Sequence, residues 1–385
     1  MTAYRYFSDA VARAAAAFVV ASAAACAFAQ TPASEIAAPD LRITSTARLL
    51  AGVSSTYEPH AHVASLDAWH KHRAALAPQW ERLRRERLSV IEGWRDEVLG
   101  ADIDRCHTLL YPFSGPDFLN AYLLFPRCDS YVFFGLERPG EVPPFEAMSR
   151  EDATALLRDV RVALGDILVR NYFITQHMAR ELQTPRLKGM LPLMLASIGL
   201  LDVRIASVEP FDLGRTAGPL PNTGTRASRR AQGVKVTFVQ PLVGKPQTLY
   251  YLSLDATDAS LRANPEFLPF LAKQNPSITF LKSASYLLHG NEFAGTRKTL
   301  LEVSDLVVQD DTGIPYRFLR ERGFDVRLFG RYARPIRDFN YGYQKDLAAA
   351  YRQVGNVSLL PFPFGYHWQE GHSGLMVARS TARRS

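Results

Sequence analysis

The stretch from Cys106 to Pro139, CHTLLYPFSGPDFLNAYLLFPRCDSYVFFGLERP, most constrains what this chain can fold into. Its first apolar run, His107 to Phe113, is short and ends at a turn signal, which is typical of a buried strand. The tetrapeptide from Ser114 to Asp117 then matches the capping box [ST]-x-x-[DE], which predicts a helix from Pro116 to Phe125. A second apolar run follows. The stretch therefore predicts a strand, a capped helix and another strand.

The start of this helix is also a candidate binding site. Helix N-termini present unpaired N–H groups and a partial positive charge, which can hold an anion. Ser114 and Asp117 are therefore candidate ligand-binding residues. A nucleophilic role for Ser114 is not favoured, because a G-x-S-x-G elbow requires a glycine two residues away on each side, and Pro112 and Pro116 stand there.

Composition places the chain among ordinary globular proteins. It has 385 residues, of which 47% are hydrophobic and 22% charged, enough for one large domain or two. The formal net charge is +7, but the excess is spread along the sequence, and part of it lies in the arginine-rich end, residues 377–385. No nucleic-acid-binding motif accompanies this charge, so no nucleic acid partner is predicted.

The N-terminus predicts export. Residues 1–29 have a positive start, an apolar run and the small-x-small sequence Ala27-Phe28-Ala29, which together are typical of a signal peptide cleaved near Ala29. Cys26 leaves lipoprotein processing open as an alternative, although no leucine-like residue precedes it. The apolar run is shorter than the roughly 20 residues of a membrane span. A periplasmic or secreted protein without a transmembrane segment is expected.

Cleavage would leave Cys106 and Cys128 in an oxidising compartment, where an even pair of cysteines favours a disulfide. The bond would close a loop of about 22 residues and stabilise the fold by roughly 3 kcal/mol. Two buried free thiols are the alternative. No C-x-x-C motif is present, so the pair does not indicate a redox enzyme.

The rest of the chain predicts interleaved helices and strands. Residues 30–45 are expected to form a flexible leader, residues 46–100 an N-terminal helical segment with one long amphipathic helix, residues 101–376 an α+β domain, and residues 377–385 a basic tail. Two alternating runs, Val234 to Gln240 and Thr248 to Leu254, flank a Gly-Lys-Pro turn and predict an antiparallel hairpin. The expected fold class is α+β, a mixed and partly antiparallel sheet flanked by helices, rather than a doubly wound parallel sheet.

A histidine cluster is the weak candidate for a metal site. His60 and His62 would share one face of an extended segment, a geometry that zinc can use. No carboxylate or cysteine is spaced to complete a tetrahedral site. A surface cluster is therefore favoured, and neither a metal nor a cofactor is predicted.

The most catalytic-looking residues lie in two later blocks. The candidates are Lys282, Ser283, Ser285, Asp310 and Asp311. If a strand ends just before Ser285, these side chains would meet at one edge of a sheet, where ligands often bind. His289 and Tyr316, close to the same blocks, are candidate ligand-binding residues. Asp311-Thr312-Gly313 also spells the aspartic protease tripeptide, but it occurs once, and a plain turn after a strand is favoured.

Four blocks resemble a family of uncharacterised exported bacterial proteins. The blocks are YPFSGPDFLNA, YVFFGLERPG, TFLKSASYLLH and VVQDDTGIPYRFL, and they span roughly residues 107–330. The resemblance implies export and a shared fold. It implies no activity, cofactor or catalytic residue.

The sequence leaves three classes of function open. The leading hypothesis is a soluble periplasmic or secreted protein that binds a small molecule or an envelope component near the ends of the central strands. The alternative is an extracytoplasmic hydrolase that uses Ser285 or the pair Asp310 and Asp311. A scaffold protein is the third possibility.

Overall fold

A mixed sheet runs through the computed structural model, which describes residues 38–170, 187–213, 232–353, 355, 357–367 and 373–382. The order of its strands is β3-β4-β5-β2-β1-β6-β7-β10-β8-β9. Their bounds are β1 Thr108–Pro112, β2 Ser130–Gly135, β3 Arg204–Asp212, β4 Gln232–Val239, β5 Pro246–Ser253, β6 Ser277–Leu281, β7 Ser304–Gln309, β8 Phe324–Gly330, β9 Val357–Ser358 and β10 Gly374–Ser380. The predicted α+β class with a mixed sheet is confirmed.

The parallel and antiparallel parts of the sheet are separated. The strands β5, β2, β1, β6 and β7 form a continuous parallel block. The predicted hairpin is present as β4 and β5, and β3 extends it. On the other side, β10 runs antiparallel between β7 and β8. Antiparallel pairing is therefore confined to the flanks, and the centre of the sheet is more regular than the sequence indicated.

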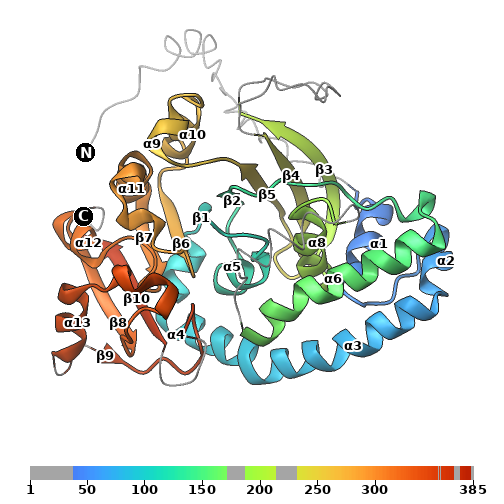
Figure 1. Cartoon of the computed structure of the whole chain (residues 1–385), viewed down its shortest axis with the longest axis horizontal. Coiled ribbons are helices and arrows are strands. Elements are labelled where there is room, and N and C mark those ends of the chain that lie inside the picture. Colours follow the sequence, from blue (N-terminus) through green and yellow to red (C-terminus); the bar gives the residue numbers. More distant parts are fainter. Residues whose placement is uncertain are drawn as a thin grey trace, which may run out of the picture. The chain divides into compact units, whose positions relative to one another are not determined.

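Helices cover both faces of the sheet (Figure 1). One face carries α1 Leu41–Leu50, α2 Ala61–Ala64, α3 Asp67–Leu83, α4 Ser89–Asp104, α5 Phe118–Leu124, α6 Arg150–Arg170 and α8 Leu191–Leu200. The other face carries α9 Asp258–Leu261, α10 Phe267–Ala272, α11 Ala294–Val303, α12 Tyr316–Glu321 and α13 Lys345–Arg352. In β1, Leu109 and Tyr111 face the first core and Leu110 faces the second, as the alternation of a strand requires. Two apolar cores thus hold the parallel strands from both sides.

The predicted long amphipathic helix is present. It consists of α3, a π-helical turn at Arg84–Leu88 and α4. Pro78 lies inside α3. Trp69, Trp80 and Trp94 are buried along the length of this helix, and α3 packs against α6 (Figure 1).

Two expected boundaries were wrong. Helix α1 starts at Leu41, within the expected flexible leader, because the side chain of Asp40 caps the N–H of Ile43. Strand β10 extends to Ser380, within the expected basic tail. Its apolar residues Met376 to Ala378 are buried in the sheet, and this burial outweighs the arginines around them. Residues 1–37, with the predicted signal peptide, lie outside the described residues.

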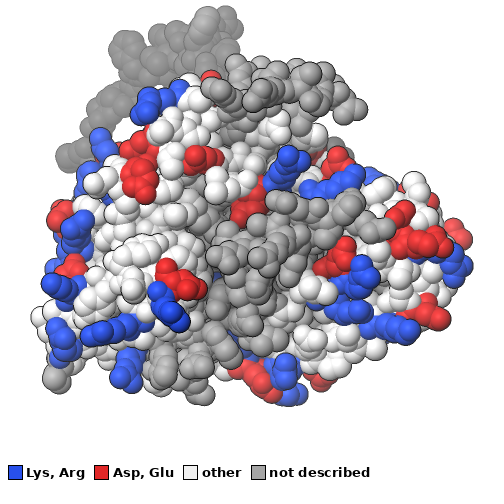
Figure 2. Space-filling view, viewed as in Figure 1, with Lys and Arg blue, Asp and Glu red and all other residues white. Residues whose placement is uncertain are grey.

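Cys106 and Cys128 form the predicted disulfide, with their Cα atoms 4.6 Å apart. It joins the end of the long helix to the turn that precedes β2. Among the described residues, none of the helices is both long enough and apolar enough to cross a bilayer. Charges of both signs are interspersed on the face shown in Figure 2, so the positive excess forms no single-sign patch there.

Candidate functional site

The predicted polar residues converge where three parallel strands end. Asp117 follows β1, Lys282 follows β6, and Asp310 and Asp311 follow β7. We call these four residues the carboxyl-edge cluster. The chain passes from β1 to β2 on one side and later returns from β5 to β6 on the other side of β1. Such a reversal is a topological switch point, and ligands of open α/β sheets bind beyond the strand ends at this place.

A buried ion pair fills the switch point itself. Nζ of Lys282 lies 2.5 Å from Oδ2 of Asp117, and the two side chains are 1% and 3% exposed. The hydroxyl of Tyr111 donates to the same carboxylate oxygen over 3.0 Å. Burial lowers the pKa of Lys282, and the carboxylate of Asp117 opposes that shift. The pair satisfies its own charges, so in this conformation the switch point is closed to a ligand.

The capping box is only partly realised. Asp117, and not Ser114, is the N-cap of α5, because its Oδ1 accepts the N–H of Asn120 over 3.3 Å. The hydroxyl of Ser114 donates to the carbonyl of Gly115. The helix begins at Phe118, two residues later than expected. Ser114 and Asp117 are both buried, and the candidate anion site at this helix is occupied by the protein's own contacts.

Asp310 ties the loops after β6 and β7 together. Its Oδ2 accepts the N–H of Ser283 over 2.9 Å. Its Oδ1 accepts the N–H of Thr312 over 3.0 Å and the hydroxyl of Thr312 over 2.5 Å. Burial, and then the charge of Asp311, raise the pKa of Asp310 to about 7. Both carboxylate oxygens are used inside the protein, which is the pattern of a structural acid.

Asp311 keeps one oxygen for other partners. Its Oδ2 accepts the hydroxyl of Tyr286 over 2.5 Å, while no other residue in the described part of the chain donates a hydrogen bond to its Oδ1. Burial raises the pKa of Asp311 to about 6. The backbone N–H of Asp311 also interacts with its own carboxylate. Of the two acids after β7, Asp311 therefore has a shifted pKa and accepts fewer hydrogen bonds from other residues than Asp310.

Ser285 lacks the partner that a nucleophile requires. Its Oγ lies 2.8 Å from the hydroxyl of Tyr366, and that hydroxyl also donates to the carbonyl of Ser283 over 3.0 Å. In the described part of the chain, no histidine, lysine or carboxylate is hydrogen-bonded to Ser285. Ser285 therefore lies near the carboxyl-edge cluster, but none of the described residues is placed to act as its general base.

The two remaining candidates support the neighbouring loops. The ring of His289 packs edge-on against Tyr286, with the ring centres 5.1 Å apart, and burial lowers the pKa of His289 to about 4. The backbone N–H of Tyr316 donates to the side chain of Gln344 over 2.7 Å. Gln344 in turn donates to the carbonyl of Asp311. Tyr316 therefore reaches the cluster only through Gln344, whereas His289 also interacts with the backbone of Asp311.

Residues with strained backbone conformations lie at the same edge of the sheet. Among the described residues, five that are not glycine have a positive φ, and four of these follow β1 or β6: Phe113, Ser283, Ser285 and Tyr286. Such conformations cost about 1–3 kcal/mol each and persist only where the surrounding contacts enforce them. They are concentrated at functional sites in many proteins, and they mark this edge as the candidate site.

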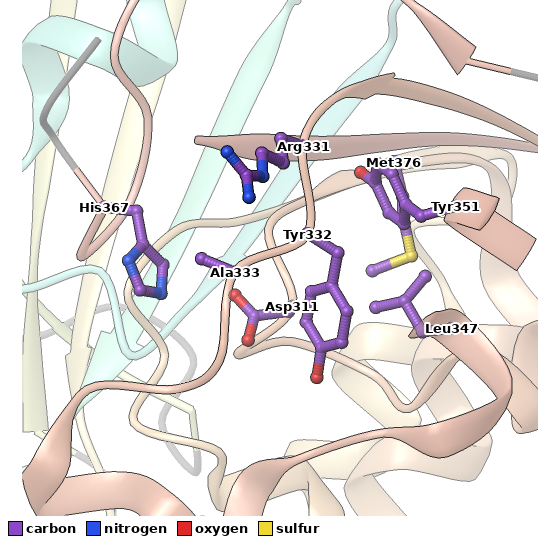
Figure 3. A pocket seen from close by; sticks show the side chains of 9 residues that line it. Asp311, Arg331, Tyr332, Ala333, Leu347, Tyr351, His367 and Met376 are labelled. Atoms are coloured by element: carbon purple, nitrogen blue, oxygen red, sulfur yellow. The ribbon is translucent and has the colours of Figure 1, made fainter. Parts of the chain in front are cut away.

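A cavity opens beside Asp311. Its volume is about 10 Å³, enough for about one water molecule. It is lined by Asp311, Arg331, Tyr332, Ala333, Leu347, Tyr351, His367, Gly374 and Met376. Figure 3 shows the carboxylate of Asp311, the guanidinium of Arg331 and the ring of His367 around one part of it. Leu347, Tyr351 and Met376 lie on the other side of Tyr332 in this view. The cavity therefore has a charged end and an apolar end.

Sequence reasoning missed every lining residue except Asp311. Arg331 and Tyr332 follow β8, and Met376 belongs to β10, so only the pairing of these strands brings them to Asp311. No motif marks them. The local signal that could have been used is the glycine at position 330, because glycine is the usual residue where the backbone needs a positive φ. Gly330 has such a φ at the point where the chain leaves β8.

The expected surface cluster on an extended segment is wrong, because His60 and His62 lie in consecutive short helical segments and only His62 is exposed. His60 is buried and its Nδ1 lies 2.7 Å from the hydroxyl of Ser45. The nitrogens of His62 lie 3.0 Å from the carbonyls of Pro59 and Phe145. Among the described residues, no group of three or more histidine, cysteine or acidic side chains is arranged to hold a metal ion.

Comparison of the chain with protein family models, with curated proteins and with solved structures finds no match. The resemblance of the four sequence blocks to an exported bacterial family stays a prediction.

Proposed function

We propose that this protein is an exported binding protein whose ligand site lies at the carboxyl edge of the parallel strands, beside Asp311. The observation that carries the proposal is the half-used carboxylate of Asp311, which lines a cavity next to a closed switch point. Strained backbone around it supports the same site. A rigid sheet edge with a few convergent polar groups is a common setting for small-molecule binding.

Export is part of the proposal. The disulfide between Cys106 and Cys128 supports an oxidising compartment, because such bonds are rare in the cytosol. Cell fractionation followed by intact mass measurement tests this. A periplasmic or secreted chain that begins at Gln30 is expected, and a full-length cytoplasmic chain would contradict export.

The binding function is tested by native mass spectrometry and thermal unfolding of the purified protein against a panel of small envelope metabolites. We expect at least one compound to raise the melting temperature of the wild-type protein, because a ligand that binds only the folded state stabilises it. The shift should be lost in Asp311→Asn, in which the charge is removed and the shape is kept. Asp338→Asn is the matched control, since Asp338 is exposed and does not line the cavity. A shift that Asp311→Asn retains would contradict the site.

A hydrolase that uses Asp311 is the second candidate. The raised pKa of Asp311, about 6, is in the range of a general acid. Turnover of model esters and glycosides that disappears in Asp311→Asn would favour this candidate over the binding function. The lack of a general base beside Ser285 gives the serine mechanism no support.

A further inference from the structure

The chain between β8 and α13 forms a loop whose two ends are joined to each other. We call residues 332–344 the β8–α13 loop. At its base, the N–H of Gln344 donates to the hydroxyl of Tyr332 over 2.8 Å, and the rings of Tyr332 and Tyr343 stack with their centres 5.7 Å apart. Compact loops of about 6–16 residues whose ends meet are Ω-loops, which are frequently functional.

The base of this loop is anchored at Asp311. The side chain of Gln344 donates to the carbonyl of Asp311 over 2.9 Å and accepts the N–H of Tyr316 over 2.7 Å. Tyr332 and Ala333 line the small cavity beside the carboxylate of Asp311 (Figure 3). Because that cavity has room for about one water molecule, the β8–α13 loop closes the space beside Asp311.

The middle of the loop rests on the ring of Tyr286. A Cβ atom added to Gly342 would stand 2.3 Å from a carbon of this ring. The rings of Phe339 and Tyr341 lie 5.5 and 6.2 Å from it, measured between ring centres. The hydroxyl of Tyr286 donates to Asp311. Tyr286 therefore connects the loop to the carboxylate that the loop covers.

The main chain of the loop contributes little to holding it in place. In the described part of the chain, the main chain of residues 333–343 makes no hydrogen bond to a residue outside the loop. Phe339 also packs against the ring of Tyr366, with the ring centres 5.2 Å apart, while Tyr341 is 69% exposed. Segments with few buried contacts open locally at a low free-energy cost. The loop can therefore move away from Tyr286 while the sheet stays folded.

We propose that the β8–α13 loop is a lid that moves about its base at Tyr332 and Gln344, leaves the ring of Tyr286 and so admits the ligand to Asp311. This role rests on the proposed binding function. It explains how a closed edge of the sheet can be a binding site, because the ligand takes the space that the loop vacates. Loops that gate access in this way are common in ligand sites.

A disulfide bond can hold the lid shut. The added Cβ atom on Gly342 would stand 2.7 Å from Cγ of Tyr286, and Cβ of Tyr286 lies further away by at most one bond. This overlaps the range of roughly 3.5–4.5 Å between the Cβ atoms of a disulfide, so the double variant Tyr286→Cys, Gly342→Cys should form the bond on oxidation. Tyr286→Cys alone is the matched control, because it removes the same ring and cannot form the bond.

Digestion of the folded protein with trypsin tests the lid without a ligand. Within the loop trypsin cuts only after Arg337, because a proline follows Arg334. Wild-type protein and Tyr286→Cys should be cut there roughly 10-fold faster, or more, than the oxidised double variant, since cutting requires the loop to open. If either is as resistant as the oxidised double variant, the proposal is overturned.

The wild-type digest also contains a comparison that needs no variant. Arg327 lies within β8, so trypsin reaches the bond after it only when the sheet unfolds. The bond after Arg337 should be cut while the bond after Arg327 is still intact, which intact mass measurement of the fragments shows. Simultaneous loss of both bonds would overturn the lid, because the loop would then open only on global unfolding.

The melting experiments separate the lid from the proposed function. Compounds of the panel that raise the melting temperature of the wild type and of Tyr286→Cys should not raise that of the oxidised double variant. An equal shift in the oxidised double variant would overturn the lid and leave the binding site standing. A loop that opens in the digest, in a protein that binds no compound of the panel, would support the lid and count against the binding function.

Discussion

Gly365 is pressed against Asp310: a Cβ atom on Gly365 would stand 2.0 Å from the Oδ2 atom of that carboxylate. The backbone at Gly365 has a φ of +64°, a conformation that L-residues rarely adopt. The segment before β10 is therefore fitted directly onto the acid that ties the loops after β6 and β7 together. No side chain can be accommodated at this contact.

Gly365→Ala should destabilise the protein by at least about 2 kcal/mol, because the left-handed backbone costs roughly 1–2 kcal/mol and the overlap with Asp310 adds to it. Chemical denaturation measures the free energy of unfolding. Gly244→Ala is the matched control, since Gly244 also has a positive φ but a Cβ atom added to it would have nothing within 4 Å. Equal losses in the two variants would show that the contact with Asp310 is not tight.

The buried pair of Lys282 and Asp117 gives a second prediction. Lys282→Met leaves the carboxylate of Asp117 buried without the ammonium group that it contacts, which should lower the free energy of unfolding by about 3–5 kcal/mol. Lys298→Met removes one partner of the exposed pair with Glu302 and should cost less than about 0.5 kcal/mol. Chemical denaturation of both variants makes the comparison. A small loss in Lys282→Met would mean that the lost ammonium group is replaced by water or by the buried guanidinium of Arg87, which also interacts with the charge of Asp117.

The two adjacent acids should make stability depend on pH. Burial raises the folded-state pKa of Asp310 to about 7 and of Asp311 to about 6, above the ordinary value of 3.8. Their contribution is therefore fully present below pH 3.8 and is lost as the pH rises through 6 and 7. The free energy of unfolding of the wild type minus that of Asp311→Asn should fall between pH 4 and pH 7, by on the order of 2 to 3 kcal/mol.

Taking this difference cancels the opposite contribution of the buried histidines, whose pKa values burial lowers. Denaturation at pH 4, 5.5 and 7 supplies the data. Asp338→Asn is again the matched control, since Asp338 is exposed and does not line the cavity. A flat difference for Asp311→Asn would mean that Asp311 titrates normally.

The disulfide supplies a fourth prediction. Breaking it frees a loop in the unfolded chain, so the double variant Cys106→Ser, Cys128→Ser should be less stable by roughly 3 kcal/mol. Thermal unfolding of the wild type with and without a reductant gives an independent measurement. Reduction should lower the melting temperature of the wild type and leave that of the double variant unchanged. Identical wild-type curves would contradict the prediction.

Local patterns were enough to predict part of this fold. The hairpin of β4 and β5 follows from the alternation of neighbouring residues. The disulfide between Cys106 and Cys128 follows from an even number of cysteines in an oxidising compartment. The meeting of Lys282 with the acids after β7 was also expected, because parallel strands end at one edge. These features need no knowledge of the strand order.

The remaining features depend on strand order, which the sequence does not reveal. The segment that forms β10 is short and ends among arginines, so its sequence is typical of a solvated tail. Only its pairing with β7 and β8 shows that it is a strand. The cavity shares this cause, since Arg331 and Met376 reach Asp311 only through that pairing. The partner of Lys282 was missed because Asp117 lies 165 positions away.

The place of β10 also bears on how the chain is completed during synthesis. β7 and β8 are neighbours of β10 and not of each other, so both keep an open row of N–H and C=O groups until residues 374–380 have been made. Open strand edges are templates for pairing with other chains. A product released before Gly374 would therefore carry two such edges in the middle of its sheet, and would be prone to aggregation, although almost all of its apolar core was already present.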